Sequence, residues 1–154
     1  ESVQPDLVGT MTDMSSVSTE SVDAVFSSHN IEHVYPHEVP VALSEFLRVL
    51  KPGGRLVICE FSHVPGFLGV FYRFYLKNVL PKISALFTKA QDAYGYLAES
   101  IAAWPNQNEL AADIEKAGFA SVAYKNLTFG VVALHSATKP SAIKPNDKLA
   151  GGKE

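Results

Sequence analysis

The chain of 154 residues has one cysteine, no excess of basic residues and no long apolar run. Because Cys59 has no second cysteine to pair with, an internal disulfide is excluded and a reduced thiol inside the cell is expected. The net charge of −3 gives no electrostatic basis for binding nucleic acid. No segment reaches the roughly 18 apolar residues of a membrane span. We therefore expect a cytoplasmic protein.

The N-terminus lacks an initiator methionine, and Glu1–Pro5 has neither the basic start nor the apolar core of a signal peptide. This favours a C-terminal fragment, although processing or trimming of a longer chain would look the same. The glycines nowhere form a Gly-x-Gly pair after a predicted strand. Such a turn lets the backbone approach a nucleotide cofactor. We expect this chain alone to bind such a cofactor weakly and to be inactive.

The first third of the chain reads as alternating strands and a helix. We expect a short strand at Leu7–Gly9 and a second strand at Val22–Ser27, which is rich in β-branched and aromatic residues. Apolar residues at helical spacing predict a helix over 38–50. Arg55–Phe61 is apolar at its centre, as is typical of a strand covered on both faces. This order implies a right-handed parallel crossover.

The remainder predicts a helical insertion and a closing hairpin. Residues 64–90 are aromatic and apolar, and a helix is expected at 92–103. Asn106 and Glu109 form a capping box that opens a helix ending at Gly118. Two further strands are expected, and a disordered tail follows them because little in it can be buried. The strands and the tail span 119–127, 131–137 and 138–154.

Two stretches carry a family resemblance. Arg48–Ser62 joins a helix, a Lys-Pro-Gly-Gly turn and a strand ending in Glu-Phe-Ser, and 92–107 reads Tyr-x-Tyr-Leu-x-Glu-Ser-Ile…Pro-x-Gln. Both resemble the ubiquinone/menaquinone C-methyltransferases, a family of Rossmann-like S-adenosylmethionine-dependent enzymes, and the match extends over 48–135. The resemblance implies an incomplete α/β sheet without its N-terminal strands and glycine-rich loop. The partial domain would span 1–137, with 64–105 as a helical lid or acceptor region.

The resemblance also implies cofactor contacts after the first two strands. Family members usually carry Gly-Asp after the first of these, whereas this chain has Gly9 followed by Thr10 and Met11. Asp13, three residues on, is a candidate to replace the missing acid. Ser28 falls where the family places a serine near the cofactor. A plain turn at Thr10–Asp13 is the alternative.

The segment after the second strand departs from the family. Its usual Phe-Gly-hydrophobic-Arg-Asn is replaced by His29-Asn30-Ile31-Glu32-His33. His29 or His33 is a candidate general base, with Glu32 beside it, because imidazole titrates near neutral pH. Two partly exposed loop histidines would be the structural alternative. His-x-x-Glu-His also spells a zinc peptidase motif, but that motif needs a continuous helix, which Pro36 prevents, so we expect no metal.

For the acceptor, the resemblance implies aromatic stacking. Tyr94, Tyr96 and Trp104 are candidates to stack on a quinol ring and Glu99 to make a polar contact, although all four could simply pack a helical subdomain. The stretch 64–90 could be a lid, a membrane-contacting segment or plain core.

The implied activity is C-methylation of a demethylmenaquinol or ubiquinol-type precursor. A general small-molecule methyltransferase and a non-catalytic remnant remain alternatives. The expected partner is a quinol-type acceptor, with peripheral membrane contact and a homodimer left open.

Overall fold

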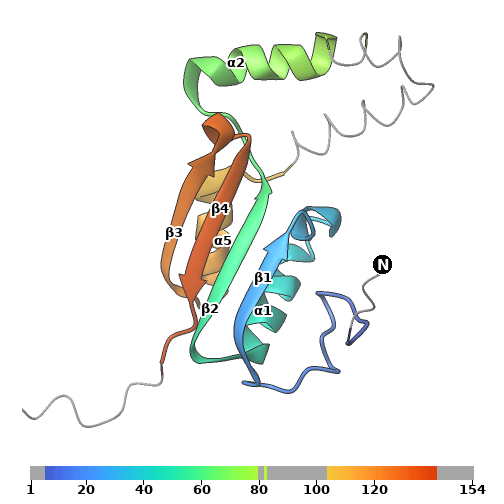
Figure 1. Cartoon of the computed structure of the whole chain (residues 1–154), viewed down its shortest axis with the longest axis vertical. Helices are drawn as coiled ribbons and strands as arrows, with labels where there is room; N and C mark the ends of the chain where they lie inside the picture. The colour runs from blue at the N-terminus through green and yellow to red at the C-terminus, as the bar shows by residue number, and fades with distance from the viewer. Residues whose placement is uncertain (1–5, 80–81, 83–103, 142–154) are drawn as a thin grey trace, which may run out of the picture.

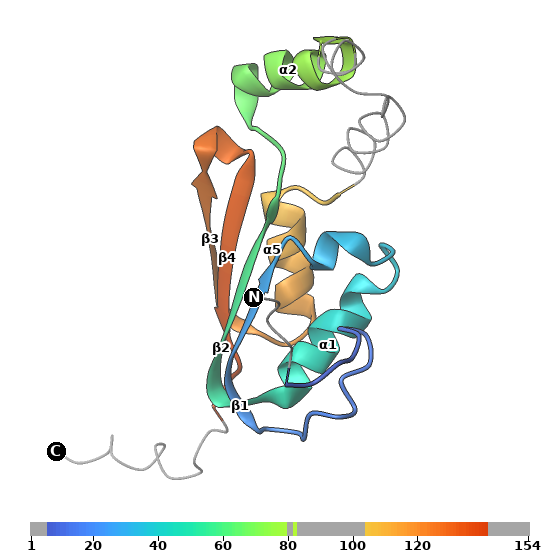
Figure 2. The same ribbon diagram turned by 45° about the vertical axis from the view of Figure 1, so that its right-hand side comes forward.

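The computed structural model describes residues 6–79, 82 and 104–141. Within these residues the strands form one four-stranded sheet in the order β1-β2-β4-β3. β1 runs parallel to β2, whereas β4 runs antiparallel to both β2 and β3. Figures 1 and 2 show the sheet with helices α1 and α5 against one of its faces. The strands are β1 Val22–Ser28, β2 Leu50–Phe61, β3 Ala120–Leu127 and β4 Val132–Thr138, and the helices are α1 Val39–Val49 and α5 Gln107–Lys116.

The predicted parallel crossover is confirmed. β1 pairs with β2 in parallel, with Phe26 opposite Val57 and Ser28 opposite Cys59. β2 lies between β1 and β4, so it is a central strand. It begins five residues earlier than predicted, because the Gly53 and Gly54 backbone exchanges two hydrogen bonds of 2.9 Å with Lys139.

Helix α1 confirms the helix predicted at 38–50. Its apolar face is buried at Leu43 and Phe46, which are 0% and 4% exposed. The helix ends at Val49, before Pro52. The following residues turn straight into β2, with Gly53 at a φ of +78°, a left-handed value that glycine adopts without strain.

The two faces of β2 are buried to different degrees. Leu56 and Ile58 face the helices and are at most 1% exposed, whereas Val57 and Cys59 on the opposite face are only half-buried. The prediction of a strand covered on both faces is therefore wrong for the part of the chain that is described. Its helices α1 and α5 both lie on the same side (Figure 2).

The C-terminal part follows the sequence pattern closely. The capping box is present, because the Asn106 side chain accepts the Glu109 N–H at 3.2 Å and the Glu109 carboxylate accepts the Asn106 N–H at 2.8 Å. β3 and β4 form the predicted antiparallel pair, joined by a 3₁₀ turn η3 (Thr128–Gly130). β4 continues through Thr138. The predicted tail boundary at 138 therefore lies inside the strand.

The strand predicted at Leu7–Gly9 is absent, whereas the helical insertion predicted after Phe61 is present at its start. Leu7–Gly9 forms no strand, because no described strand lies beside it to supply hydrogen bonds, and its chain continues into a turn closed by a Thr10–Asp13 bridge. The helical insertion does begin after β2, with α2 (Gly66–Phe74) and a π-helical turn η2 (Tyr75–Val79). The helix predicted at 92–103 lies outside the described residues. None of the described helices is long and apolar enough to cross a membrane.

Candidate functional site

The candidate site lies where the parallel strands β1 and β2 end. Ligands of open parallel sheets bind beyond the carboxyl ends of the strands. Directly after β1 the His29 N–H donates to the Cys59 carbonyl at 3.0 Å, which carries the ladder one residue past the strand. The chain then turns into η1 (Ile31–His33). This turn brings the segment with most of the candidate catalytic side chains to the end of β2.

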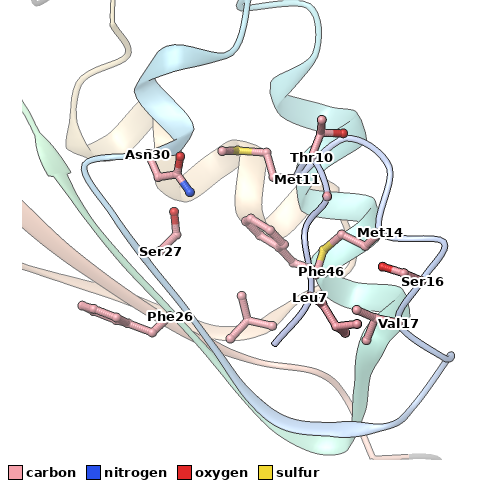
Figure 3. A pocket seen from close by; sticks show the side chains of 12 residues that line it. Leu7, Thr10, Met11, Met14, Ser16, Val17, Phe26, Ser27, Asn30 and Phe46 are labelled. Atoms are coloured by element: carbon pink, nitrogen blue, oxygen red, sulfur yellow. The ribbon is translucent and has the colours of Figure 1, made fainter. Parts of the chain in front are cut away.

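A cavity of about 280 Å³ opens beside the end of β1. Figure 3 shows its lining, which combines a mainly apolar wall with a few polar groups. The predicted residues Thr10 and Met11 both line it. Apolar walls with a small number of polar groups are typical of small-molecule sites. The apolar wall includes Met11, Met14, Val25 and Phe46, and the polar groups include Thr10, Ser27 and Asn30.

The cavity is lined by Ser27 rather than by the predicted Ser28. Ser27 is 4% exposed, and its hydroxyl has no hydrogen-bond partner among the described residues. Ser28 is exposed and lies on the opposite face of the strand. The alternation of side chains along β1, which puts Ser27 on the same face as Val25, is the sequence signal that identifies Ser27.

Asp13 is engaged within its own turn. Its N–H donates to the Thr10 hydroxyl at 3.1 Å, and its carboxylate accepts the Ser15 N–H at 3.1 Å. The structure therefore places Thr10 and Met11 at the cavity, whereas Asp13 and Ser28 are not among its lining residues.

An ion pair within α1, between Glu45 and Arg48, holds the loop that carries Thr10 and Met11 through hydrogen bonds to the loop backbone. Arg48 donates to Glu45 at 2.8 Å through both Nε and Nη2, and it also donates to the carbonyls of Met14 and Val17. Glu45 in turn accepts the Met14 N–H at 2.9 Å. The Arg48 side chain, followed by the Met14 N–H, lowers the pKa of Glu45 to about 2. This carboxylate therefore stays charged and holds the loop over most of the pH range.

A cluster of titratable side chains lies on the other side of Asn30. Glu32 lies between the two predicted histidines, with its Oε1 3.9 Å from His29 Nδ1 and 3.9 Å from His33 Nε2. The fourth member is Glu60 of β2, which is 1% exposed. The ligand atoms of His29, Glu32 and Glu60 all lie within 4.8 Å of one another. Asn30 connects the two halves of the site, since it also lines the cavity.

The His-x-x-Glu-His pattern falls on a single 3₁₀ turn, whereas the zinc peptidase motif needs both histidines on one face of a continuous helix. Burial raises the pKa of Glu60, and the charge of Glu32 raises it further, while the Asn30 and Ile31 amides oppose the shift. Glu60 therefore ionises less readily than an ordinary glutamate.

The predicted acceptor residues are only partly visible. Trp104 is 7% exposed and belongs to the apolar core, where its ring also borders a surface groove with Pro36 and Val39. Its indole N–H has no partner among the described residues. Tyr94, Tyr96 and Glu99 lie outside the described residues. Trp104 is therefore the one predicted acceptor residue that the structure describes, and it packs against the core.

Comparison with known proteins gives a consistent family match. The model of the ubiE/COQ5 methyltransferase family matches residues 7–139. A demethylmenaquinone methyltransferase of Corynebacterium efficiens is 46% identical over 122 residues, which are 78% of this chain and 52% of that protein. One of Thermobifida fusca is 52% identical over 119 residues, 77% of this chain and 50% of that protein. The chain thus spans about half the length of the curated relatives it matches.

Solved structures support the fold. A S-adenosylmethionine-dependent methyltransferase of Thermotoga maritima, described as a possible histamine N-methyltransferase, superposes with a TM-score of 0.58 at 20% identity and covers 86% of this chain and 63% of its own. A phosphoethanolamine N-methyltransferase of Haemonchus contortus, in complex with S-adenosylmethionine, has a TM-score of 0.54 at 15% identity, covering 81% of this chain and 35% of its own. At such identities the likeness concerns the fold.

Proposed function

We propose, from the premise that this chain belongs to the ubiE/COQ5 methyltransferase family, that the complete protein methylates a ring carbon of a demethylmenaquinol-type acceptor with S-adenosylmethionine. The observation that carries the proposal is the position of Asn30. Its side chain borders the cavity, and its backbone N–H donates to Glu60 of the titratable cluster at 3.0 Å. A methyl-donor pocket and a proton-accepting cluster are therefore adjacent at the ends of two parallel strands, as a methyl transfer requires.

The cavity beside β1 fits part of the methyl donor. Its apolar wall of Met11 and Phe46 suits a flat heterocycle, and the Ser27 hydroxyl, buried without a partner, suits a polar edge. Thr10 would contact the same end, and Asp13 and Ser28 would need the loop or the strand end to shift before reaching it. When bound, S-adenosylmethionine supplies a methyl group already activated on a sulfonium, so the protein chiefly aligns the acceptor and excludes water.

We assign each residue of the cluster a role in proton transfer. His29 or His33 would accept the phenolic proton of the acceptor, which makes the ring carbon nucleophilic toward the methyl group, and the Glu32 carboxylate between them would stabilise the imidazolium that results. The imidazolium would return its proton to the oxygen as the methylated carbon releases its ring hydrogen as the net proton, which restores the aromatic quinol. His29 is the stronger candidate, because its side chain is 45% exposed against 73% for His33 and it faces Glu60 as well. Tyr94, Tyr96, Glu99 and Trp104 would contact the acceptor ring.

A general small-molecule methyltransferase is the second candidate, because acidic Glu32 stands where the quinone enzymes carry arginine. The two are separated by assaying the complete protein with labelled S-adenosylmethionine against demethylmenaquinol and against small phenols and amines. We expect product only from the quinol, detected by mass spectrometry as a gain of one methyl group. Turnover confined to amines would favour the second candidate. The absence of all turnover in a folded complete protein would favour a non-catalytic remnant.

We further propose that α2 contacts the membrane in which a prenylated acceptor dissolves. The helix extends beyond the sheet (Figure 1), and Phe67, Val70, Phe71 and Phe74 are each more than half exposed. Arg73 is the basic residue of its last turn. Large apolar side chains around a short helix, with a neighbouring cation, suit insertion into the boundary region of a bilayer.

The membrane proposal predicts a loss of vesicle binding in the Phe67→Ser/Phe71→Ser double variant. Burying one phenylalanine side chain contributes about 1.5–3 kcal/mol, so we expect binding at least about tenfold weaker in co-sedimentation with phosphatidylglycerol vesicles. Phe26→Ser is the matched control, because Phe26 is equally apolar and 69% exposed but lies on β1. Equal loss in both variants, or no loss in either, would contradict a role for α2.

A further inference from the structure

Glu60 is a buried acid in an otherwise apolar row. It shares the helix-facing side of β2 with Leu56 and Ile58, and all three are at most 1% exposed. A carboxyl group in such a place destabilises the fold unless hydrogen bonds compensate for the water it has lost. Apolar residues of similar size would pack there without that cost. Its presence therefore calls for an explanation other than packing.

The hydrogen bonds of Glu60 are directed at one turn of the backbone. Its Oε1 accepts the N–H groups of Asn30 and Ile31 at 3.0 and 3.2 Å. Its Oε2 is buried and has no partner among the described residues. The two amides belong to the residues that directly follow His29. One oxygen of a side chain on β2 thus holds the first residues after β1.

The turn that Glu60 holds is strained at His29. His29 has a φ of +48°, a left-handed conformation that costs a residue other than glycine roughly 1 kcal/mol or more. Such a conformation persists only where the surroundings fix it. Here the His29 N–H is bonded to Cys59, and the next two amides are bonded to Glu60. The His29 ring also rests against Phe61, with centroids 4.9 Å apart.

We propose that Glu60 is a positioning residue, whose Oε1 holds the turn after β1 in the shape that presents His29 and Glu32 to the acceptor. The inference rests on the proposed function, because it assigns Glu60 a role in that same site. Glu60 and Phe61, the last two residues of β2, together fix the backbone and the ring of the proposed base. The contact spans 30 residues of sequence and joins the parallel strands β1 and β2 at their carboxyl ends.

The first test is amide hydrogen exchange of Asn30 and Ile31, measured by NMR on this chain. Glu60→Leu keeps the volume but removes the acceptor, so we expect both amides to exchange at least about tenfold faster. Glu60→Gln keeps a carbonyl oxygen in the place of Oε1, and exchange should stay within about threefold. Glu38→Leu is the matched control, because Glu38 also accepts a backbone N–H, that of Tyr35 at 3.0 Å. Unchanged exchange in Glu60→Leu would overturn the proposal.

The second test separates kcat from KM in the complete protein. Glu60→Leu should lower kcat about 10- to 100-fold, because a misplaced base loses alignment, and should raise KM for S-adenosylmethionine by a smaller factor, because Asn30 of the same turn lines the cavity. Glu60→Gln should restore most of kcat. Faster exchange with unchanged kcat would overturn the positioning role. Failure of the proposed function is seen separately, as absent turnover in the unsubstituted protein, and the exchange test then decides alone whether Glu60 holds the turn.

Discussion

His29→Phe is expected to lower kcat of the complete protein by about 10²- to 10⁴-fold, the contribution typical of a general base. Phenylalanine keeps an aromatic ring where His29 contacts Phe61, so the change removes the titratable nitrogen while retaining the packing. The loss should fall on kcat, with KM for S-adenosylmethionine within about threefold, because His29 is not among the residues that line the cavity.

Two matched variants make this result specific. His33→Phe changes the other histidine beside Glu32, and the smaller of the two losses identifies the histidine that is not the base. His37→Phe changes a histidine that stacks on Tyr35 away from the cluster, and it should leave kcat within about twofold. Equal kcat in the His29 and His37 variants would remove His29 from the mechanism and return the choice of base to His33 or to the acceptor's own ionisation.

Local patterns in the sequence predict the elements well because each is specified by neighbouring residues. Asn106 and Glu109 are three residues apart, and their reciprocal hydrogen bonds start α5 as expected. The parallel pairing of β1 with β2 likewise follows from the strand–helix–strand order. The strand predicted at Leu7–Gly9 does not form, because a strand depends on a distant partner rather than on neighbouring residues. It exists only where a second strand supplies its hydrogen bonds.

The site depends on contacts that a linear pattern does not contain. The resemblance pointed to Ser28, but the pleat of β1 turns Ser27 into the cavity. Glu60 could be read from the sequence only as an acid at a strand end, since its bonds to Asn30 and Ile31 cross from one strand to the other. Trp104 packs against the core, because an apolar ring is buried wherever the tertiary fold offers a place, and its contact with the acceptor stays a prediction.

Ile58→Ala is expected to lower the free energy of unfolding of this chain by about 2–5 kcal/mol, because it deletes a fully buried side chain and leaves a cavity. Ile58 is 0% exposed and lies between β2 and the helices of the covered face. Ile58→Val should cost only about 0.5–1.5 kcal/mol. Urea denaturation followed by circular dichroism gives both values, provided that the slope with denaturant is unchanged.

Val57→Ala is the variant to compare with Ile58→Ala, because Val57 is the neighbouring residue of β2 and lies on the half-buried face. In this chain it should cost less than about 1.5 kcal/mol, since water already reaches that face. The chain spans about half the length of its curated relatives, and a doubly wound sheet carries helices on both faces. In the complete protein the cost of Val57→Ala should therefore rise toward that of Ile58→Ala. An unchanged small cost there would mean that the second face stays open to solvent, and that the sheet is not completed in the doubly wound manner.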